Sequence, residues 1–418
     1  MRPSLISRLF FHNDHTHRYK QQLLCMRRGD TSLSKQQPLH PQHRLLLSTS
    51  CTLDDNNQFD GTRSSPCRRH VVKLYNALDQ GLMHYETSWA WQQVLLSRRL
   101  QSKHAKRLQL SSSTNNNYNN KDQDDVPCEH ANGDCVLMLE HAPVYTLGRG
   151  ADENHLTFFH QEPHPSPMEN DNNIERTTSY HGTDHNSIES LRWKLSRKAR
   201  GPGTARLSMD RQLQDSCLGY HTDSNIPIHQ AVQLLQKVVS EQVTPVFAPN
   251  RVPIYRVERG GEVTFHGPQQ LVVYPLLDLQ QDQTTSYKQD LHWYLRQIET
   301  VIIQTLQDFG IHNATRDEIN TGVWVNEKKV AAVGISSSRW ITTHGFALNV
   351  DPDLSYFDTS MILPCGVEGR GVTSIAEILR EEQQNEGTKT VTIIPSMQQV
   401  ADSIAKNMER VFEIKLQQ

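Results

Sequence analysis

Cysteine pairs with metal-ligand or disulfide spacing are missing from this sequence. Its 418 residues include 7 cysteines, an odd number scattered along the chain, and no Cys-x-x-Cys occurs. Disulfide scaffolds and zinc sites need regularly spaced cysteines, so this pattern is typical of a protein from a reducing compartment. Cys128, His130 and Cys135 lie near one another, but no fourth ligand is close in sequence. We therefore predict no metal centre and no cofactor.

Long apolar runs and an excess of charge of one sign are also missing. No run approaches the roughly 18 apolar residues that a membrane span needs. The formal net charge of -3 gives no reason to expect nucleic acid as a partner. Only 36% of the residues are hydrophobic, so we expect part of the chain to lie outside the folded core. The sequence predicts a soluble protein that binds neither a membrane nor nucleic acid.

Residues 1–70 are interpreted as a leader. The first fifty contain eight Lys or Arg, two Asp and no Glu, and Leu5–Phe11 mixes apolar and basic side chains. A secretory signal has a longer apolar centre, so the composition resembles an organelle transit peptide. We predict a mitochondrial leader first and a plastid leader second, because the two types overlap in composition. A plain polar tail is the alternative.

Residues 71–418 are predicted to form one domain with two polar insertions. Folded sequence begins near Val71, and the first insertion is expected at about 101–127, which contains a Ser- and Asn-rich tract. The second, at about 160–225, is interpreted as a structureless surface segment. Its basic patch at Arg197–Arg200 is interpreted as a solvated cluster, with contact to an acidic carrier protein as the alternative.

Hydrophobic periodicity predicts strands alternating with a few helices. Strands are expected at 135–139, 254–257, 263–265, 271–277, 323–325 and 330–333, and helices near 85–96, 291–306 and 397–412. Ser286–Gln289 has capping-box spacing just before the second helix, and Gly310 follows its end. The predicted fold class is a mixed α/β domain.

Lys329 is expected just after a hairpin turn, because two short apolar runs flank the polar residues Asn326–Lys328. Strand alternation predicts two faces, one with Lys329, Ala331 and Val333 and the other with Val330, Ala332 and Gly334.

Cys365, in Met361–Gly366, and Lys329 are the candidate catalytic pair. A thiolate is the attacking species in acyl transfer, and a neighbouring ammonium lowers a thiol pKa of roughly 8.5 towards neutrality. The alternative is a buried small residue and a solvated strand end, and the neighbouring segments decide between the two.

Arg259–Pro275 has the pattern of a ligand-facing loop between short apolar strands. Gly260 and Gly261 allow positive φ and a close approach of the backbone, and His266 adds a polar group beside an apolar floor. An ordinary hairpin is the alternative, but the length and order of the string argue against it.

Together these segments resemble the signature of lipoyl(octanoyl) transferases, which move octanoyl from acyl carrier protein to lipoyl domains. The matching segments, in chain order, are Glu140–Ala151, Arg259–Pro275, Thr321–Asn326, Lys329–Gly334, His344–Asn349, Pro364–Gly366 and Gly371–Ser374. One position departs from the family pattern His-Gly-Pro-Gly-Gln, because Gln269 stands in place of the second glycine. This departure concerns the conformation of the loop after Pro268.

The resemblance implies the mixed sheet backed by helices that biotin and lipoate protein ligases share, with Cys365 as the acyl-thioester nucleophile. It implies that Lys329 lowers the pKa of that thiol and relays protons. The implied acyl-site residues are Arg259, Gly260, Gly261, Glu262, Val263, Thr264, Phe265, His266, Ala332, Val333, Gly334, Gly345, Phe346 and Ala347. The implied donor is octanoyl-acyl carrier protein, and the implied acceptors are lipoyl domains of 2-oxoacid dehydrogenase complexes or the glycine cleavage H protein.

Three other functions stay open on the sequence. An ATP-dependent lipoate or biotin ligase of the same fold would need no cysteine, and no Gly-rich nucleotide loop is apparent. A cysteine hydrolase would pair Cys365 with His266 or His344. A non-catalytic acyl-binding or carrier-protein-binding module would tolerate the loss of Cys365.

Overall fold

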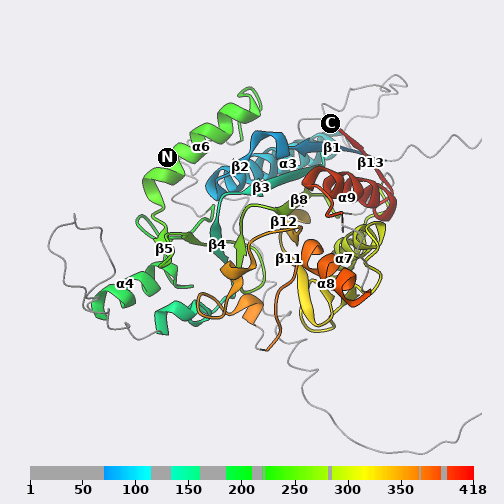
Figure 1. The fold of residues 1–418 in the computed structure, drawn as a ribbon. Helices are drawn as coiled ribbons and strands as arrows, with labels where there is room; N and C mark the ends of the chain where they lie inside the picture. The colour runs from blue at the N-terminus through cyan, green and yellow to red at the C-terminus, as the bar shows by residue number, and fades with distance from the viewer. Residues whose placement is uncertain are drawn as a thin grey trace, which may run out of the picture. The chain divides into compact units, whose positions relative to one another are not determined.

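The computed structural model describes residues 70–113, 133–160, 185–209, 219, 222–280, 285–366, 369–386 and 393–418 (Figure 1). All of them belong to one compact unit, Arg68–Gln418. The predicted leader up to Arg69, Cys128, His130 and most of the predicted insertions lie outside these ranges. Within them, no helix combines the length and apolar character needed to cross a membrane.

A mixed sheet of nine strands forms the centre of this unit. Its order is β13-β1-β3-β8-β12-β11-β10-β9, and β2 pairs with β3. The bounds are β1 His70–Asn76, β2 Leu82–Met83, β3 Cys135–His141, β8 Gln270–Leu276, β9 Thr315–Arg316, β10 Val323–Val325, β11 Lys328–Ser338, β12 Ile341–Asn349 and β13 Ile414–Gln417. β1 is parallel to β13 and β3, whereas the strands from β3 to β9 pair antiparallel. The predicted mixed α/β class is confirmed.

A second, smaller sheet has the order β5-β6-β4-β7. Its strands are β4 Val144–Leu147, β5 Val246–Phe247, β6 Pro253–Arg256 and β7 Val263–His266. β7 pairs antiparallel with β4, so the motifs at 140–151 and 259–275 become neighbours in space.

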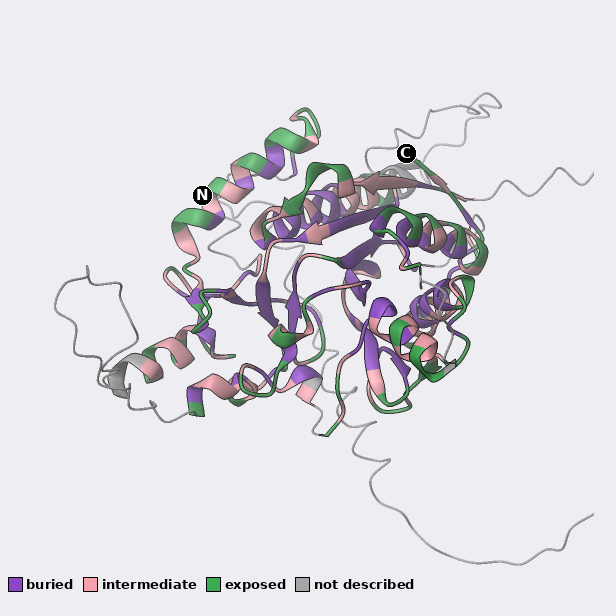
Figure 2. Cartoon of the chain, viewed as in Figure 1, coloured by how far each residue is buried: buried purple, intermediate pink, exposed green. Residues whose placement is uncertain are grey.

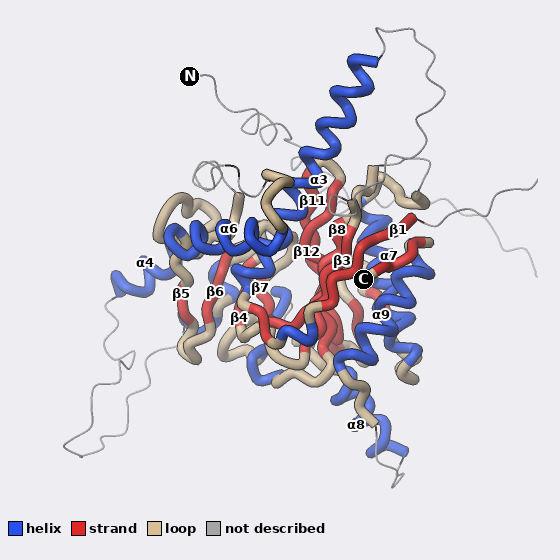
Figure 3. The backbone as a smooth tube through the Cα atoms, turned by 90° about the horizontal axis from the view of Figure 1, so that it is seen from above, coloured by secondary structure: helices blue, strands red, loops and turns tan. Residues whose placement is uncertain are grey.

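Helices cover both faces of the larger sheet. The helices are α3 Tyr85–Ser113, α4 His185–Leu195, α6 Ile228–Gln242, α7 Leu291–Asp308, α8 Ile375–Glu386 and α9 Met397–Val411, with short 3-10 turns η1 Leu78–Gln80, η3 Glu153–His155, η4 Thr157–His160, η5 Leu354–Phe357 and η6 Pro364–Gly366. α7 and α9 lie on one side of this sheet, and α3 with α6 lies on the other (Figure 3).

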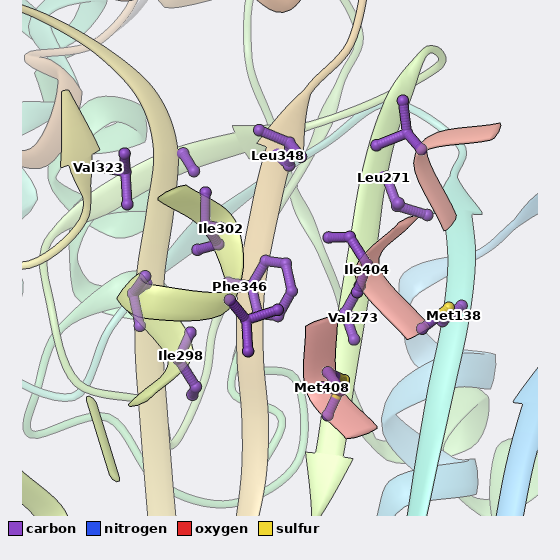
Figure 4. Packing of buried hydrophobic residues seen from close by; sticks show 14 of the residues in the cluster. Met138, Leu271, Val273, Ile298, Ile302, Val323, Phe346, Leu348, Ile404 and Met408 are labelled. Atoms are coloured by element: carbon purple, nitrogen blue, oxygen red, sulfur yellow. The ribbon is translucent and has the colours of Figure 1, made fainter. Parts of the chain in front are cut away.

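Alternate residues of the central strands belong to different core clusters. On one face Met138, Leu271, Val273, Phe346 and Leu348 pack against Ile298 and Ile302 of α7 and Ile404 and Met408 of α9 (Figure 4). On the other face Leu137, Val272 and Tyr274 pack with Leu95 of α3. Both faces of β3 and β8 are therefore buried, which explains their nearly continuous apolar sequence (Figure 2).

The cap of α7 differs from the prediction. Asp290 is the N-cap, and its carboxylate accepts from the backbone N–H groups of His292 and Trp293 at 2.8 and 3.2 Å. Ser286 instead donates its hydroxyl to the carbonyl of Phe412. The predicted capping box at Ser286–Gln289 is wrong, because Asp290 stands next to the first turn and satisfies its N–H groups directly. A capping box is present at α9, between Ser396 and Gln399.

The two predicted insertions contain more structure than expected. α3 continues through the beginning of the first one to Ser113. In the second, Leu195 and Leu207 are buried, and the segment pairs with β6. The N–H of Leu207 donates to the carbonyl of Arg256 at 2.9 Å, and the N–H of Arg256 donates to the carbonyl of Ala205 at 2.8 Å. The interpretation as structureless is wrong for 195–207, because this segment pairs with the end of β6 at Arg256, beyond the residues of β6 that pair with β5.

Candidate active site

A cavity of about 220 Å³ lies between the two sheets, on the α3 side of the larger one. The predicted catalytic residue Lys329 lines it, as do most of the predicted acyl-site residues: Arg259, Gly261, Glu262, Val263, Thr264, His266, Ala332, Val333, Gly334, Gly345, Phe346 and Ala347. Gly260 and Phe265 are not part of the lining. Phe265 points to the opposite side of β7, where its ring stacks on Tyr356 with centroids 4.3 Å apart. Further lining residues are Tyr85, Val272, Tyr274, Ile319, Asn320, Thr321 and His344.

Two cross-strand pairs of small residues form one wall of the cavity. Ala332 pairs with Ala347, and Gly334 pairs with Gly345, in the antiparallel register of β11 and β12. A Cβ at Gly345 would lie 2.2 Å from the carbonyl oxygen of Val273, so no larger residue fits there. Because these four positions carry at most a methyl group, the sheet surface is left open for a ligand.

The glycine loop comes close to this wall. The N–H of Gly260 donates to the carbonyl of Ile335 at 2.9 Å, and a Cβ at Gly334 would lie 3.0 Å from the carbonyl oxygen of Gly260. Gly261 has φ 88°. The predicted close backbone approach is thus present at Gly260 and the positive φ at Gly261, whereas Gly260 itself does not have a positive φ.

A β-bulge changes which side chains of β11 face the cavity. Trp324 pairs with Lys329 and Val323 pairs with Ala331, so Val330 is an extra residue. Val330 and Ala331 both join the core on the α7 side, whereas Lys329 lines the cavity with Ala332 and Gly334. The predicted faces are wrong for Lys329 and Val330, since a bulge shifts the alternation by one residue, whereas Ala332 and Gly334 share a face as predicted. The predicted hairpin turn is confirmed, with Asn326 and Glu327 at φ 48° and 63°.

Lys329 is buried, and its ammonium has two partners. Nζ donates to the carbonyl of Thr321 at 3.2 Å and lies 4.6 Å from the ring centroid of Trp324. The backbone N–H of Lys329 donates to the carbonyl of Gly371, and the carbonyl of Lys329 accepts from the backbone N–H of Thr373. Lys329 forms no ion pair with a carboxylate among the described residues. The carbonyl and the aromatic face together hold the amine of Lys329 in place at the cavity.

The backbone of Cys365 lies in η6, which runs beside β7. Gly366 has φ 66°, and a Cβ there would lie 3.0 Å from Cγ of Glu262 and 3.0 Å from Cε1 of His155. Nδ1 of His155 is 3.0 Å from a carboxylate oxygen of Glu262, and the carbonyl of His155 accepts from the N–H of Leu363. Since Glu262 also lines the cavity, the backbone at Gly366 lies against the cavity wall. The side chain of Cys365 is outside the described part of the chain.

Gln269, which stands where the family pattern has a glycine, lies in the turn between β7 and β8. Gln269 has φ 62°, the region in which glycine is usually found, and the N–H of Gln270 donates to the carbonyl of Gly267 across the turn. The backbone N–H of Gln269 donates to Glu140 at 2.7 Å. The turn keeps the conformation that suits glycine, so the departure strains one residue instead of reshaping the loop.

Two buried histidines near the cavity have defined tautomers. His141 donates from Nδ1 to the carbonyl of Met83 at 3.0 Å and accepts the hydroxyl of Tyr274 at Nε2 at 2.8 Å. His266 donates from Nδ1 to Oε1 of Gln270 at 2.8 Å, because the amide of Gln270 donates elsewhere. Burial lowers the pKa of His141 to about 4. Burial, with the nearby His141 and Arg259, holds the pKa of His266 well below 6.5, so both rings are neutral at pH 7.

His344 differs from both. It is 2% exposed, lines the cavity, and has φ 58° inside β12. Neither ring nitrogen has a hydrogen-bond partner, and Nε2 lies 3.7 Å from the carboxylate of Glu258. The sequence indicated His344 only as one possible partner for a thiol. It gave no sign that Tyr85 and Tyr274, from distant segments, meet at the same cavity.

Comparisons with known proteins identify the family of this chain. Residues 235–404 match the family model for the lipoyl protein ligase A/B catalytic domain. An octanoyltransferase of Gloeobacter violaceus is 32% identical over 301 residues, which cover 72% of this chain and 79% of that protein. A chloroplastic octanoyltransferase of Arabidopsis thaliana is 42% identical over 164 residues, covering 39% of this chain and 55% of that protein. A ligase function is not favoured, because these relatives are octanoyltransferases.

A putative lipoate protein ligase from T. acidophilum with bound lipoic acid aligns over 84% of this chain and 88% of its own, with a TM-score of 0.39 and 10% identity. The family assignment rests on the family model and on the relatives of higher identity. The chain belongs to the octanoyltransferase family, and it is an acyltransferase of protein lipoylation with the α/β fold of the lipoyl protein ligase A/B catalytic domain.

Proposed function

We propose that this enzyme moves octanoyl from octanoyl-acyl carrier protein to a lysine of a lipoyl domain through a thioester on Cys365. The observation that carries the proposal is the cavity wall made by the Ala332–Ala347 and Gly334–Gly345 pairs. This wall is open enough for an acyl chain, and it continues to Lys329. Gly366, next to Cys365, packs against Glu262 on the opposite side.

In the first half-reaction the thiolate of Cys365 attacks the donor thioester. A bond forms between Sγ and the carbonyl carbon, and the bond to the phosphopantetheine sulfur breaks. The Lys329 ammonium, held by Thr321 and Trp324, favours the thiolate of Cys365 and gives its proton to the leaving phosphopantetheine thiolate, which leaves Lys329 as the neutral amine.

In the second half-reaction a lysine amine of the acceptor attacks octanoyl-Cys365. The C–N bond forms as the bond from the carbonyl carbon to Sγ breaks, Sγ leaves as the thiolate, and the amine of Lys329 accepts the proton of the acceptor nitrogen. An amide replaces a thioester, so this step runs forward. The acceptor is a lipoyl domain of a 2-oxoacid dehydrogenase complex or the glycine cleavage H protein. Length selection follows from burial, because each methylene in the cavity contributes about 0.8 kcal/mol.

We also propose that residues 1–70 direct the enzyme to an organelle, the mitochondrion first and the plastid second. The basic leader composition and a relative named as chloroplastic support an organellar form. Expression of residues 1–70 fused to a fluorescent protein tests this, and diffuse cytosolic signal would contradict it.

Intact mass after brief incubation with octanoyl-acyl carrier protein, without ATP, tests the covalent route. The wild-type chain should gain one octanoyl group, and the Cys365→Ala variant should gain none. Cys135→Ala is the matched control, since burial raises the pKa of the Cys135 thiol and keeps it protonated. It should be acylated like the wild type.

Normal transfer by a folded Cys365→Ala protein would contradict the thioester route. A ligase would instead show no adduct without ATP, and transfer only after ATP and free octanoic acid are added.

A further inference from the structure

The indole ring of Trp324 on β10 contacts two basic side chains. Nζ of Lys329 lies 4.6 Å from the ring centroid, and the guanidinium carbon of Arg370 lies 3.6 Å from it. Trp324 is 2% exposed, and its indole N–H donates to the carbonyl of Asn320 at 3.3 Å. Arg370 is not part of the cavity lining. It therefore contacts a residue that holds Lys329 without reaching the cavity itself.

Two carboxylates hold Arg370 against this ring. One end of its guanidinium pairs with Asp317, which precedes β10, and the other pairs with Glu327 in the hairpin turn at 3.0 Å. Nε of Arg370 also donates to the backbone carbonyl of Glu327 at 3.3 Å. A planar guanidinium can bind two carboxylates and stack on an aromatic face at the same time. Arg370 thus fixes the ring between the loop before β10 and the hairpin after it.

The carboxylate of Asp317 shapes the loop that follows it. Oδ1 accepts from the backbone N–H groups of Ile319 and Asn320 at 2.8 and 2.7 Å. The N–H of Asn320 above all, with Arg370 and the N–H of Ile319, lowers the pKa of Asp317 to about 2. The carboxylate is therefore ionised at neutral pH and holds this loop in one conformation.

Both contacts of the Lys329 amine depend on this arrangement. Thr321 continues the same loop, and its carbonyl accepts from Nζ at 3.2 Å, while Trp324 supplies the ring. A Cβ at Gly322 would lie 3.3 Å from Cε of Lys329, so the loop also packs along the aliphatic part of the side chain. Loss of Arg370 would loosen the ring directly and the carbonyl through the loop.

Arg370 also belongs to the segment that carries Cys365, which it follows by five positions. The carbonyl of Gly371 accepts the backbone N–H of Lys329 at 2.9 Å, and the N–H of Thr373 donates to the carbonyl of Lys329 at 3.0 Å. This backbone pairing fixes the strand, but a lysine side chain is a long flexible stem, so it does not place the amine. The side chain of Arg370 adds that second connection.

We propose that Arg370 is a positioning residue for octanoyl transfer: stacked on Trp324 and paired with Asp317 and Glu327, it fixes the amine of Lys329 at the cavity. The inference rests on the proposed function, in which that amine exchanges a proton with the leaving thiol and then with the acceptor. Proton transfer needs the amine within hydrogen-bond reach of the reacting atoms, and a small misplacement lowers the rate strongly.

Single-turnover formation of octanoyl-enzyme tests the proposal on the full chain. Intact mass follows the reaction at several concentrations of octanoyl-acyl carrier protein, which separates the maximum rate from the half-saturating concentration. Arg370→Gln should lower the maximum rate by about 10- to 100-fold and leave the half-saturating concentration within about twofold. Arg380→Gln is the matched control, because Arg380 forms a bidentate pair with Asp351 on the surface. It should react like the wild type.

A double-mutant cycle shows whether Arg370 acts through Lys329. Lys329→Ala removes the amine, so adding Arg370→Gln to it should cause no further loss of rate. A purely structural role would lower the rate by the same factor in both backgrounds.

Two further substitutions separate positioning from folding. Arg370→Lys keeps the charge but not the planar fork, so it should have a melting temperature near that of the wild type and still be slow. Trp324→Phe keeps an aromatic face and should retain most of the rate, whereas Trp324→Leu should be as slow as Arg370→Gln.

Equal losses in the wild-type and Lys329→Ala backgrounds, or a raised half-saturating concentration with an unchanged maximum rate, would overturn the proposal. If the wild-type chain forms no octanoyl-enzyme, or Lys329→Ala forms it at the wild-type rate, the proposed function fails and this inference falls with it. That failure is visible without any Arg370 variant, so the two are distinguishable.

Discussion

The two faces of the larger sheet are formed by the same strands but have different roles. On the α7 and α9 face, Val273, Ile302 and Phe346 fill the space completely. On the α3 face, the alanine and glycine pairs of β11 and β12 leave a cavity. One strand therefore contributes packing energy on one side and room for a substrate on the other.

The difference also appears in the polar residues. Among the described residues, the buried polar side chains of α7 and α9 are Glu299, Thr305 and Asn407, whereas three buried histidines, His141, His266 and His344, lie on the cavity side. Buried histidines cost desolvation energy when charged, so the cavity face contributes less to stability at low pH. Substitutions on the packed face should affect stability, and those on the cavity face should affect activity.

Lys329→Ala should have the largest effect on activity of the substitutions on the cavity face. We expect the rate of octanoyl-enzyme formation to fall by about 10²–10⁴-fold, most evidently near neutral pH, because the ammonium beside the thiolate is lost. Rapid-quench kinetics with intact mass measures this. Lys328→Ala is the matched control, since Lys328 pairs with Glu381 at 3.0 Å on the surface. Equal loss in both variants would remove the role assigned to Lys329.

Ile302→Ala should have its effect on the packed face. The side chain is fully buried on α7, so we expect the free energy of unfolding in urea to fall by about 2–5 kcal/mol. The transfer rate per folded molecule should not change. A loss of rate without a loss of stability would contradict the division between the two faces.

Acid should destabilise the protein through the cavity face. Burial depresses the pKa of His141 to about 4 in the fold, whereas the unfolded chain takes up a proton near 6.5. The stability from neutral His141 is thus complete above pH 6.5 and is lost as pH falls towards 4, by about 3 kcal/mol in all.

Unfolding curves of the wild type and His141→Gln at pH 7 and pH 5 check this. Glutamine keeps an acceptor for Tyr274 and a donor for Met83 but does not titrate in this range. The variant should lose less stability between the two pH values. Equal losses would show that His141 does not stay neutral in the fold.

Ala347→Leu should narrow the cavity and shift the preferred acyl length downwards. Each methylene that no longer fits loses about 0.8 kcal/mol, or roughly fourfold in kcat/KM. Competition between hexanoyl- and octanoyl-acyl carrier protein measures the ratio. Ala331→Val adds bulk on the other face of β11, so it should lower stability and leave this ratio unchanged.

Gln269→Gly should give the smallest effect, a gain of about 1–2 kcal/mol in the free energy of unfolding. It removes a side chain from a residue at φ 62° and keeps the backbone hydrogen bond to Glu140. Thermal unfolding measures the gain, and Gln269→Ala, which keeps the strain, should show none.

Much of the cavity was predictable because its residues lie in compact motifs. Gly261, Lys329 and Ala332 belong to short segments whose residue types are already informative in sequence. Phe265 was misplaced because its neighbours on β7 face the cavity while it faces the core of the smaller sheet. Alternation along one strand does not reveal which face meets which partner.

Other features depended on contacts between distant segments. The bulge at Val330 places Lys329 on the same face as Ala332 and Gly334, and no local signal near Lys329 indicates it. The 195–207 segment has the composition of a surface loop, yet it pairs with β6. Local propensity is weak compared with packing and backbone pairing.

By itself the sequence determined the chemistry that is available: a thiol at Cys365, an amine at Lys329, and small residues at 332, 334, 345 and 347. These are properties of the covalent chain, and they are known before the fold is known. The tertiary structure alone decided that the small residues pair across two strands, that Lys329 shares their face, and that His344 is buried beside Glu258 in a strained conformation. Those outcomes come from non-local packing, which holds residues in positions that their local sequence does not favour.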